Sequence, residues 1–204
     1  MDNFILGLLT GGSLILAIGP QNLFVIEQGL KKNFVFTVTT ICAVSDILLI
    51  LLGIFIYNIF EDIPLKIEII LNILLILFLI RYIKSKIVES TLKFKLNTNQ
   101  QKQNYRKIIF KTLGFTYLNP HVYSDTVFIL GNLSKNFTLS NKIFFAIGAS
   151  LASIIFFYSL GYLSSVFANS IKKGSVWKYI NQFIIIFMSV IVVFIIYDTF
   201  LRLL

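Results

Sequence analysis

Polar residues interrupt an otherwise apolar stretch of the chain at residues 116–125, which read TYLNPHVYSD. Proline removes a backbone donor and clashes with the preceding turn, so we expect a helix to break here, with Asn119 capping a half-helix that Pro120 opens. His121 is the only histidine, and it either titrates or serves as a neutral hydrogen-bonding neighbour. Asp125, with Tyr123 beside it, is expected to face a cavity.

A second break is predicted at AIGPQN, residues 17–22. Gly19 is expected to act as a cap at this break, and Pro20 to be the first residue of the second half. The N-terminus of a half-helix presents amide hydrogens and a positive dipole end, which suit an anion such as an amino-acid carboxylate. Gln21 and Asn22 would add hydrogen bonds. Structural kinking without a ligand is the alternative.

Asp46, which follows Ser45, lies near the middle of the apolar run 35–57. An aspartate at the bilayer centre costs about 3 kcal/mol, but the Val, Ile, Leu and Phe residues of this run return roughly 6 kcal/mol. The segment therefore inserts, and Asp46 is expected to face the bundle interior and mark a substrate or ion path. An aspartate that only holds two helices together is the alternative. The segment 108–131 carries several polar residues and must be sheltered by the other helices.

These residues need apolar helices to position them. The chain is 57% hydrophobic, with a mean hydropathy of +0.86, and so is predicted to be an all-α integral membrane protein. Runs close to the roughly 20 residues that a spanning helix needs occur at residues 4–26, 35–57, 65–82, 108–131, 143–168 and 177–201. We therefore predict six transmembrane helices.

A polar, basic stretch divides the six helices into two halves. Residues 1–83 form the first three-helix repeat, 84–107 a cytoplasmic linker, and 108–204 the second repeat. Three spans per half force the halves into opposite orientations, a common plan among secondary transporters. Two of the three prolines, Pro20 and Pro120, occupy corresponding places, so helices 1 and 4 are predicted to be the broken ones.

The net charge of +9 is assigned to cytoplasmic loops rather than to nucleic-acid binding. Most of the 18 Lys and Arg residues lie in or beside the loops after helices 1, 3 and 5, which places both termini outside. The single cysteine, Cys42, excludes dithiol exchange within one chain. One histidine and no metal-ligand spacing argue against hydrolytic or zinc chemistry, so no enzyme activity, metal or cofactor is expected.

The segments IGPQNLFVIEQG, AVSD, YLNPHVYSDTVFILG and VWKYIN resemble the lysine exporter family of bacterial inner-membrane amino-acid exporters, most closely its arginine exporter branch. The resemblance covers essentially the whole chain and implies efflux of basic amino acids. It assigns a part in transport to the polar motif residues Gly19, Pro20, Gln21, Asn22, Ser45, Asp46, Asn119, Pro120, His121, Tyr123 and Asp125.

The leading hypothesis is a secondary transporter that exports arginine or lysine by proton antiport, driven by the proton-motive force. The substrate carboxylate would bind at a broken-helix N-terminus and its cationic group near Asp46 or Asp125, with Asp46 the first choice for proton coupling. Export of a neutral amino acid or a metal cation, or a passive channel, stays open. The small residues Gly148, Ala149, Ser150, Ala152 and Ser153 could support helix contacts within the chain or in a homo-oligomer.

Overall fold

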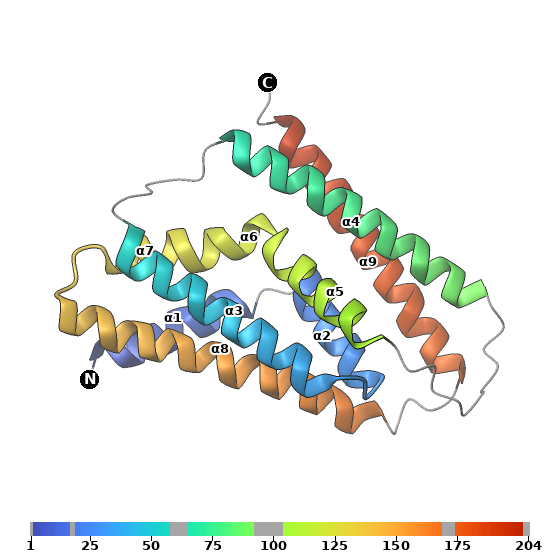
Figure 1. Cartoon of the computed structure of the whole chain (residues 1–204), viewed down its shortest axis with the longest axis horizontal. Coiled ribbons are helices and arrows are strands. Elements are labelled where there is room, and N and C mark those ends of the chain that lie inside the picture. Colours follow the sequence, from blue (N-terminus) through green and yellow to red (C-terminus); the bar gives the residue numbers. More distant parts are fainter. Residues whose placement is uncertain (1, 17–18, 58–64, 92–103, 169–173, 202–204) are drawn as a thin grey trace.

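The computed structural model describes residues 2–16, 19–57, 65–91, 104–168 and 174–201, and regular structure in these ranges is helical. Figure 1 shows the helices from the N-terminus in blue to the C-terminus in red. In chain order they are α1 (Asp2–Ile15), α2 (Pro20–Leu30), α3 (Val35–Ile56), α4 (Leu65–Thr91), α5 (Tyr105–Tyr117), α6 (Pro120–Tyr123), the π-helix η2 (Ser124–Ile129), α7 (Leu130–Ser134), α8 (Leu139–Phe167) and α9 (Gly174–Leu201).

Several of these helices are long and apolar enough to cross a bilayer. In the described residues, α3, α8 and the stretch Tyr179–Leu201 of α9 qualify alone, and α1 with α2 qualifies as one further span bent by 82°. The protein is thus a helical membrane protein with several spans. The predicted third span, α4, carries Lys66 near one end and three basic residues from Arg81 onward, and the fourth is divided from α5 to α7. The total of six stays a prediction.

Both predicted helix breaks are present. α2 begins at Pro20 after Gly19, whose backbone is extended. α6 begins at Pro120, and the Asn119 side chain accepts a hydrogen bond from the backbone N–H of His121 at 3.2 Å. Each proline stands at the first helical position. A backbone N–H at this position has no acceptor within the helix, so proline loses no hydrogen bond there. The π-helix that follows α6 was not predicted; such widened turns are frequent at functional sites.

Helices α4 and α5 extend into the predicted linker 84–107. Helix α4 continues to Thr91, and α5 begins at Tyr105, where the Asn104 side chain caps it by accepting from the backbone N–H of Arg106 at 3.0 Å. Helical structure thus occupies both ends of the predicted linker. Residues 92–103 lie outside the described ranges.

Helices α1 and α8 approach each other at backbone distance. A Cβ added to Gly7 would lie 2.1 Å from the carbonyl oxygen of Phe145, and one added to Gly148 would lie 2.1 Å from that of Phe4. Such close crossings need residues without side chains. Gly148, Ala149 and Ala152 therefore serve contacts within the chain, and a homo-oligomer stays a prediction.

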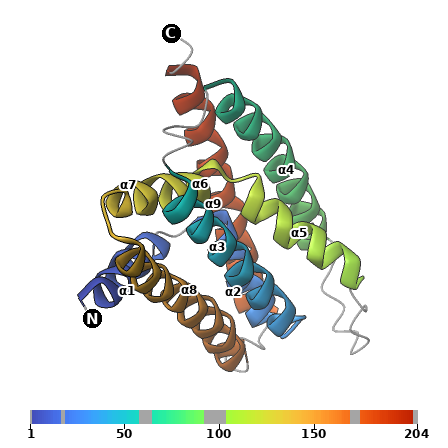
Figure 2. The same ribbon diagram turned by 60° about the vertical axis from the view of Figure 1, so that its left-hand side comes forward.

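Helices α4 and α9 form an elongated pair beside the other helices, as Figures 1 and 2 show from two directions. Hydrogen bonds join the pair toward both ends: Asn72 Nδ2 donates to Thr199 Oγ1 at 3.0 Å, and Asn181 Nδ2 donates to the Lys86 carbonyl at 3.1 Å. The pair can therefore be treated as one unit.

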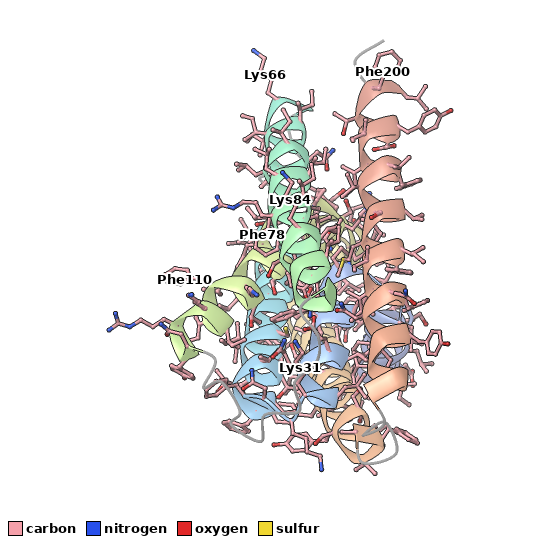
Figure 3. The ribbon with its side chains drawn as sticks, turned by 90° about the vertical axis from the view of Figure 1, so that its right-hand side faces the viewer. Lys31, Lys66, Phe78, Lys84, Phe110 and Phe200 are labelled. Carbon is pink, nitrogen blue, oxygen red and sulfur yellow. The ribbon has the colours of Figure 1, made fainter. Side chains whose placement is uncertain are left out.

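Large apolar side chains cover much of the outer surface. Phe110 and Phe200 project outward in Figure 3 and are 72% and 59% exposed. Along α9, apolar residues such as Ile186, Val190 and Val193 are also exposed. A soluble protein rarely exposes so continuous an apolar surface, whereas lipid tails would cover it in a membrane.

Candidate functional site

A cavity of about 390 Å³ lies where the two helix breaks meet α3, α8 and α9. This volume falls in the range of small-molecule sites. Its polar lining consists of Gln21, Asn22, Asp46, Asn119, His121, Asp125 and Thr126. Its remaining lining is Gly11, Leu14, Ile15, Gly19, Pro20, Ile50, Val122, Leu130, Phe157, Ile191, Phe194 and Ile195.

The two breaks face each other across this cavity. A Cβ placed on Gly19 would lie 3.9 Å from the Asn119 amide nitrogen, which is ordinary van der Waals contact. Residues 100 positions apart in the chain thus bring two irregular segments together. Backbone groups freed by a break are tolerable at membrane depth only where protein or a water-filled cavity satisfies them, and both breaks lie beside protein groups and this cavity.

The first break presents a buried amide to the cavity. Asn22 Nδ2 donates to the carbonyl of Ile15 at 3.1 Å, and so satisfies an oxygen freed at the end of α1. The neighbouring Gln21 is 5% exposed, and its Nε2 has no oxygen or nitrogen partner among the described residues. The Gln21 side chain also lies against the buried Cys42 thiol, which is only a weak hydrogen-bonding partner, so its amide keeps donor capacity for a ligand oxygen.

Two carboxylates reach the cavity from the neighbouring elements α3 and η2. Asp46, on α3, is 3% exposed, and its Oδ2 accepts a hydrogen bond from Ser153 Oγ on α8 at 3.2 Å. Asp125, on η2, is half-buried and interacts electrostatically with His121 and with Asp46. No lysine or arginine of the described ranges forms an ion pair with either carboxylate. The site can therefore accept a cationic group.

Most predicted site residues lie at this cavity, but three do not line it. Ser45 is buried beside Asp46. Pro120 is buried at the start of α6. Tyr123 turns back over the break and donates its hydroxyl to the Tyr117 carbonyl at 2.8 Å. These three residues therefore lie next to the cavity without lining it, and their part in transport stays a prediction.

Sequence reasoning missed several residues that shape the cavity. Ser153 was noted only as a small residue for helix packing, although it holds Asp46. Thr126 and the α9 residues Ile191, Phe194 and Ile195 also line the cavity. Their types are ordinary for membrane helices, so no sequence signal could have separated them from neighbours that face lipid. Within the described ranges, no group of three His, Cys, Asp or Glu residues could hold a metal ion.

Comparison with known proteins gives a consistent result. The family model of the LysE type translocator matches residues 12–199. The arginine exporter protein ArgO of Klebsiella pneumoniae is 33% identical over 182 residues, covering 86% of this chain and 84% of that protein. ArgO of Pectobacterium carotovorum is 33% identical (89% and 90% covered), and ArgO of Photorhabdus laumondii is 30% identical (92% of each covered). No solved structure matches the chain.

Proposed function

This chain belongs to the LysE type translocator family, and we propose that it exports a basic amino acid, arginine or lysine, across the bacterial inner membrane. It is a transporter and not an enzyme. The relatives named as arginine exporters match it over most of their length. The observation that carries the proposal is the cavity itself, where Asp46 and Asp125 meet without a lysine or arginine partner in the described residues.

The cavity suits both ends of such a substrate. The first N–H groups of α2 have no acceptor four residues earlier, and the positive end of the helix dipole lies there. Together with the Gln21 amide, they would bind the α-carboxylate. The guanidinium or ammonium of the side chain would reach Asp46 or Asp125. The carboxylate that binds it then gains a counter-charge, which offsets the cost of burying that charge.

Coupling to protons follows from the membrane potential. Moving a monocation out against an inside-negative potential costs about 2.3 kcal/mol per 100 mV, so uphill export must be driven. Exchange of the substrate for one proton cancels this movement of charge. A carboxylate that holds either the substrate cation or a proton would perform the exchange, and we assign this role to Asp46.

The architecture proposed for this function is a pair of inverted three-helix repeats with broken helices 1 and 4. Support comes from the two breaks, which start at corresponding prolines and face each other at the cavity. The charge distribution favours both termini outside. In this orientation α1 runs inward, and the loop after α2 lies on the cytoplasmic side.

Labelled-arginine uptake into inside-out vesicles tests the proposal, with and without an imposed proton gradient. We expect saturable, gradient-driven uptake. Asp46→Asn should lower it at least about tenfold, because truncating one partner of a buried charge pair costs about 2 kcal/mol or more. The matched control is Asp2→Asn, at an exposed aspartate of α1, which should transport normally.

The same assay separates the alternatives. Gradient-independent flux that does not saturate would indicate a channel. No uptake by correctly inserted parent protein would refute the substrate, and competition with neutral amino acids and metal cations would then identify the solute. Proton-coupled export that survives in Asp46→Asn would refute the coupling role of Asp46.

A further inference from the structure

A buried ionic cluster lies on α2 away from the cavity. Glu27 is 2% exposed, and its carboxylate accepts hydrogen bonds from the Tyr82 hydroxyl and the Lys86 ammonium, both on α4. Lys31 Nζ lies 2.8 Å from Glu27 Oε1. Lys86 is itself 3% exposed. The carboxylate thus holds two ammonium groups inside the protein, one of them from a distant helix.

The ionic cluster lies on the same face of α2 as the cavity residue Pro20, but nearer to the C-terminus of the helix. Pro20, Phe24 and Glu27 recur at helical spacing on this face, so Glu27 lies about 10 Å beyond Pro20 at 1.5 Å per residue. Phe24 lies between them and stacks on Phe115 with ring centroids 4.7 Å apart. Tyr82 packs edge-on against Phe115 at 4.9 Å. An aromatic layer thus separates the cavity from the ionic cluster.

The cavity and the Glu27 cluster lie toward opposite assigned sides of the membrane. The cavity lining includes Gly11, Leu14, Leu130 and Ile195, which lie in the halves of the predicted spans 4–26, 108–131 and 177–201 that are assigned to the outer side. The Glu27 cluster joins the C-terminal ends of α2 and α4, assigned to the cytoplasmic side. In the proposed orientation, the cavity therefore lies toward the outside and the Glu27 cluster toward the cytoplasm.

The cluster also joins two units of the fold. Helix α4 belongs to the α4–α9 pair, and Asn181 of α9 donates to the Lys86 carbonyl. Glu27 belongs to α2, which packs on α8 and α3. Separating these units at the cytoplasmic end would therefore pull Lys86 from Glu27. Lys31 would stay with Glu27 on α2, but the buried carboxylate would lose its partner on α4, which is unfavourable unless another cation takes that position.

We propose that Glu27 is a second cation-binding group, at the cytoplasmic entry of the substrate route to the cavity. In the closed state, the Lys86 ammonium occupies the position on Glu27 that the cationic group of the substrate takes on entry. The proposal rests on basic amino-acid export. An entering guanidinium or ammonium exchanges with the Lys86 ammonium, so the carboxylate keeps a counter-charge throughout. Lys86 then leaves with α4, and the aromatic layer opens toward the cavity. Binding of the substrate to Glu27 thus releases Lys86 and thereby opens the cytoplasmic side.

Cysteine labelling from the cytoplasmic face tests this exchange. The native thiol is removed by Cys42→Ala, and Val122→Cys places a reporter in the cavity lining. In inside-out vesicles, the rate of reaction with a membrane-impermeant thiol reagent reports cytoplasmic access. We expect slow labelling that arginine accelerates several-fold. Citrulline, the neutral isostere of arginine, should leave the rate unchanged.

Variants of the ion pair should change this rate in a specific order. Lys86→Met should raise labelling without arginine by on the order of tenfold, because the closed state loses the ion pair that joins α2 to α4, while Lys31 stays with Glu27. Lys84→Met, at an exposed lysine of the same helix, is the control and should match the parent. Glu27→Gln should abolish the response to arginine. The double variant Glu27→Gln/Lys86→Met removes both charges with little change of shape and guards against a folding defect.

Two outcomes would overturn the proposal: slow labelling of Lys86→Met, or an arginine response that survives Glu27→Gln. A purely structural ion pair would lower thermal stability without changing cytoplasmic access. Uptake of labelled arginine by the parent is measured in parallel. Its absence would refute the proposed substrate, whereas the labelling of Lys86→Met would still decide whether the ion pair closes the cytoplasmic end.

Discussion

The contact between α1 and α8 predicts opposite effects for one substitution at two glycines of the same helix. A Cβ on Gly7 would lie 2.1 Å from the carbonyl oxygen of Phe145, a backbone atom. A Cβ on Gly12 would lie 3.9 Å from the Cβ of Ala152, which is ordinary contact. Gly7→Ala must therefore push the two helices apart, whereas Gly12→Ala fits as the structure stands.

The expected magnitudes follow from two terms. Replacing a helical glycine by alanine gains up to about 1 kcal/mol at both positions. Overpacking at Gly7 costs about 1–3 kcal/mol. Gly12→Ala should therefore be neutral or stabilising, Gly7→Ala should be neutral to destabilised by about 2 kcal/mol, and the two variants should differ by about 1–3 kcal/mol.

Thermal unfolding of the purified protein in detergent measures this difference. One kcal/mol shifts the unfolding midpoint by about 2–4 °C for a domain of this size, so Gly7→Ala should melt several degrees below Gly12→Ala. Displacement of α1 also moves the cavity residues Gly11 and Leu14, so Gly7→Ala should transport arginine more slowly as well. Equal midpoints for the two variants, or a higher one for Gly7→Ala, would refute the close approach of α1 and α8.

Three further substitutions test other contacts. Ser153→Ala removes the hydrogen bond to Asp46 and should raise the KM for arginine about tenfold, since a hydrogen bond to a charged group contributes about 1.5 kcal/mol; an unchanged KM in vesicle uptake would contradict this. Asn119→Ala should lower the free energy of unfolding by about 1 kcal/mol through loss of the N-cap, while Asn119→Ser keeps it; identical melting of the two would argue against the cap. Asn72→Leu should destabilise the α4–α9 pair by about 1–3 kcal/mol because it leaves the buried Thr199 hydroxyl without its donor, and adding Thr199→Val should recover most of this loss in the same melting assay; no recovery would count against the pairing.

Helix positions and breaks were accessible from the sequence because they depend on local properties. Apolar runs long enough to span predicted α3, α8 and α9 to within a few residues of their observed bounds. Proline removes a backbone donor wherever it stands in a helix, so Pro20 and Pro120 marked the starts of α2 and α6. The polar residues around them lie at the cavity because a membrane helix has few other places for them.

Only the tertiary structure decided which of these residues meet. Three contacts join residues 59 to 107 positions apart: the hydrogen bond of Ser153 to Asp46, the contact of Gly19 with Asn119, and the ion pair of Glu27 with Lys86. The sequence placed Lys86 among the cytoplasmic basic residues, where a solvated charge is the usual expectation. Its burial depends on how α4 packs against α2, and that packing is the sum of many weak side-chain contacts that no local pattern encodes. The local sequence thus determined which segments form helices and where these break. The packing of the helices determined which residues form the cavity and the Glu27 cluster.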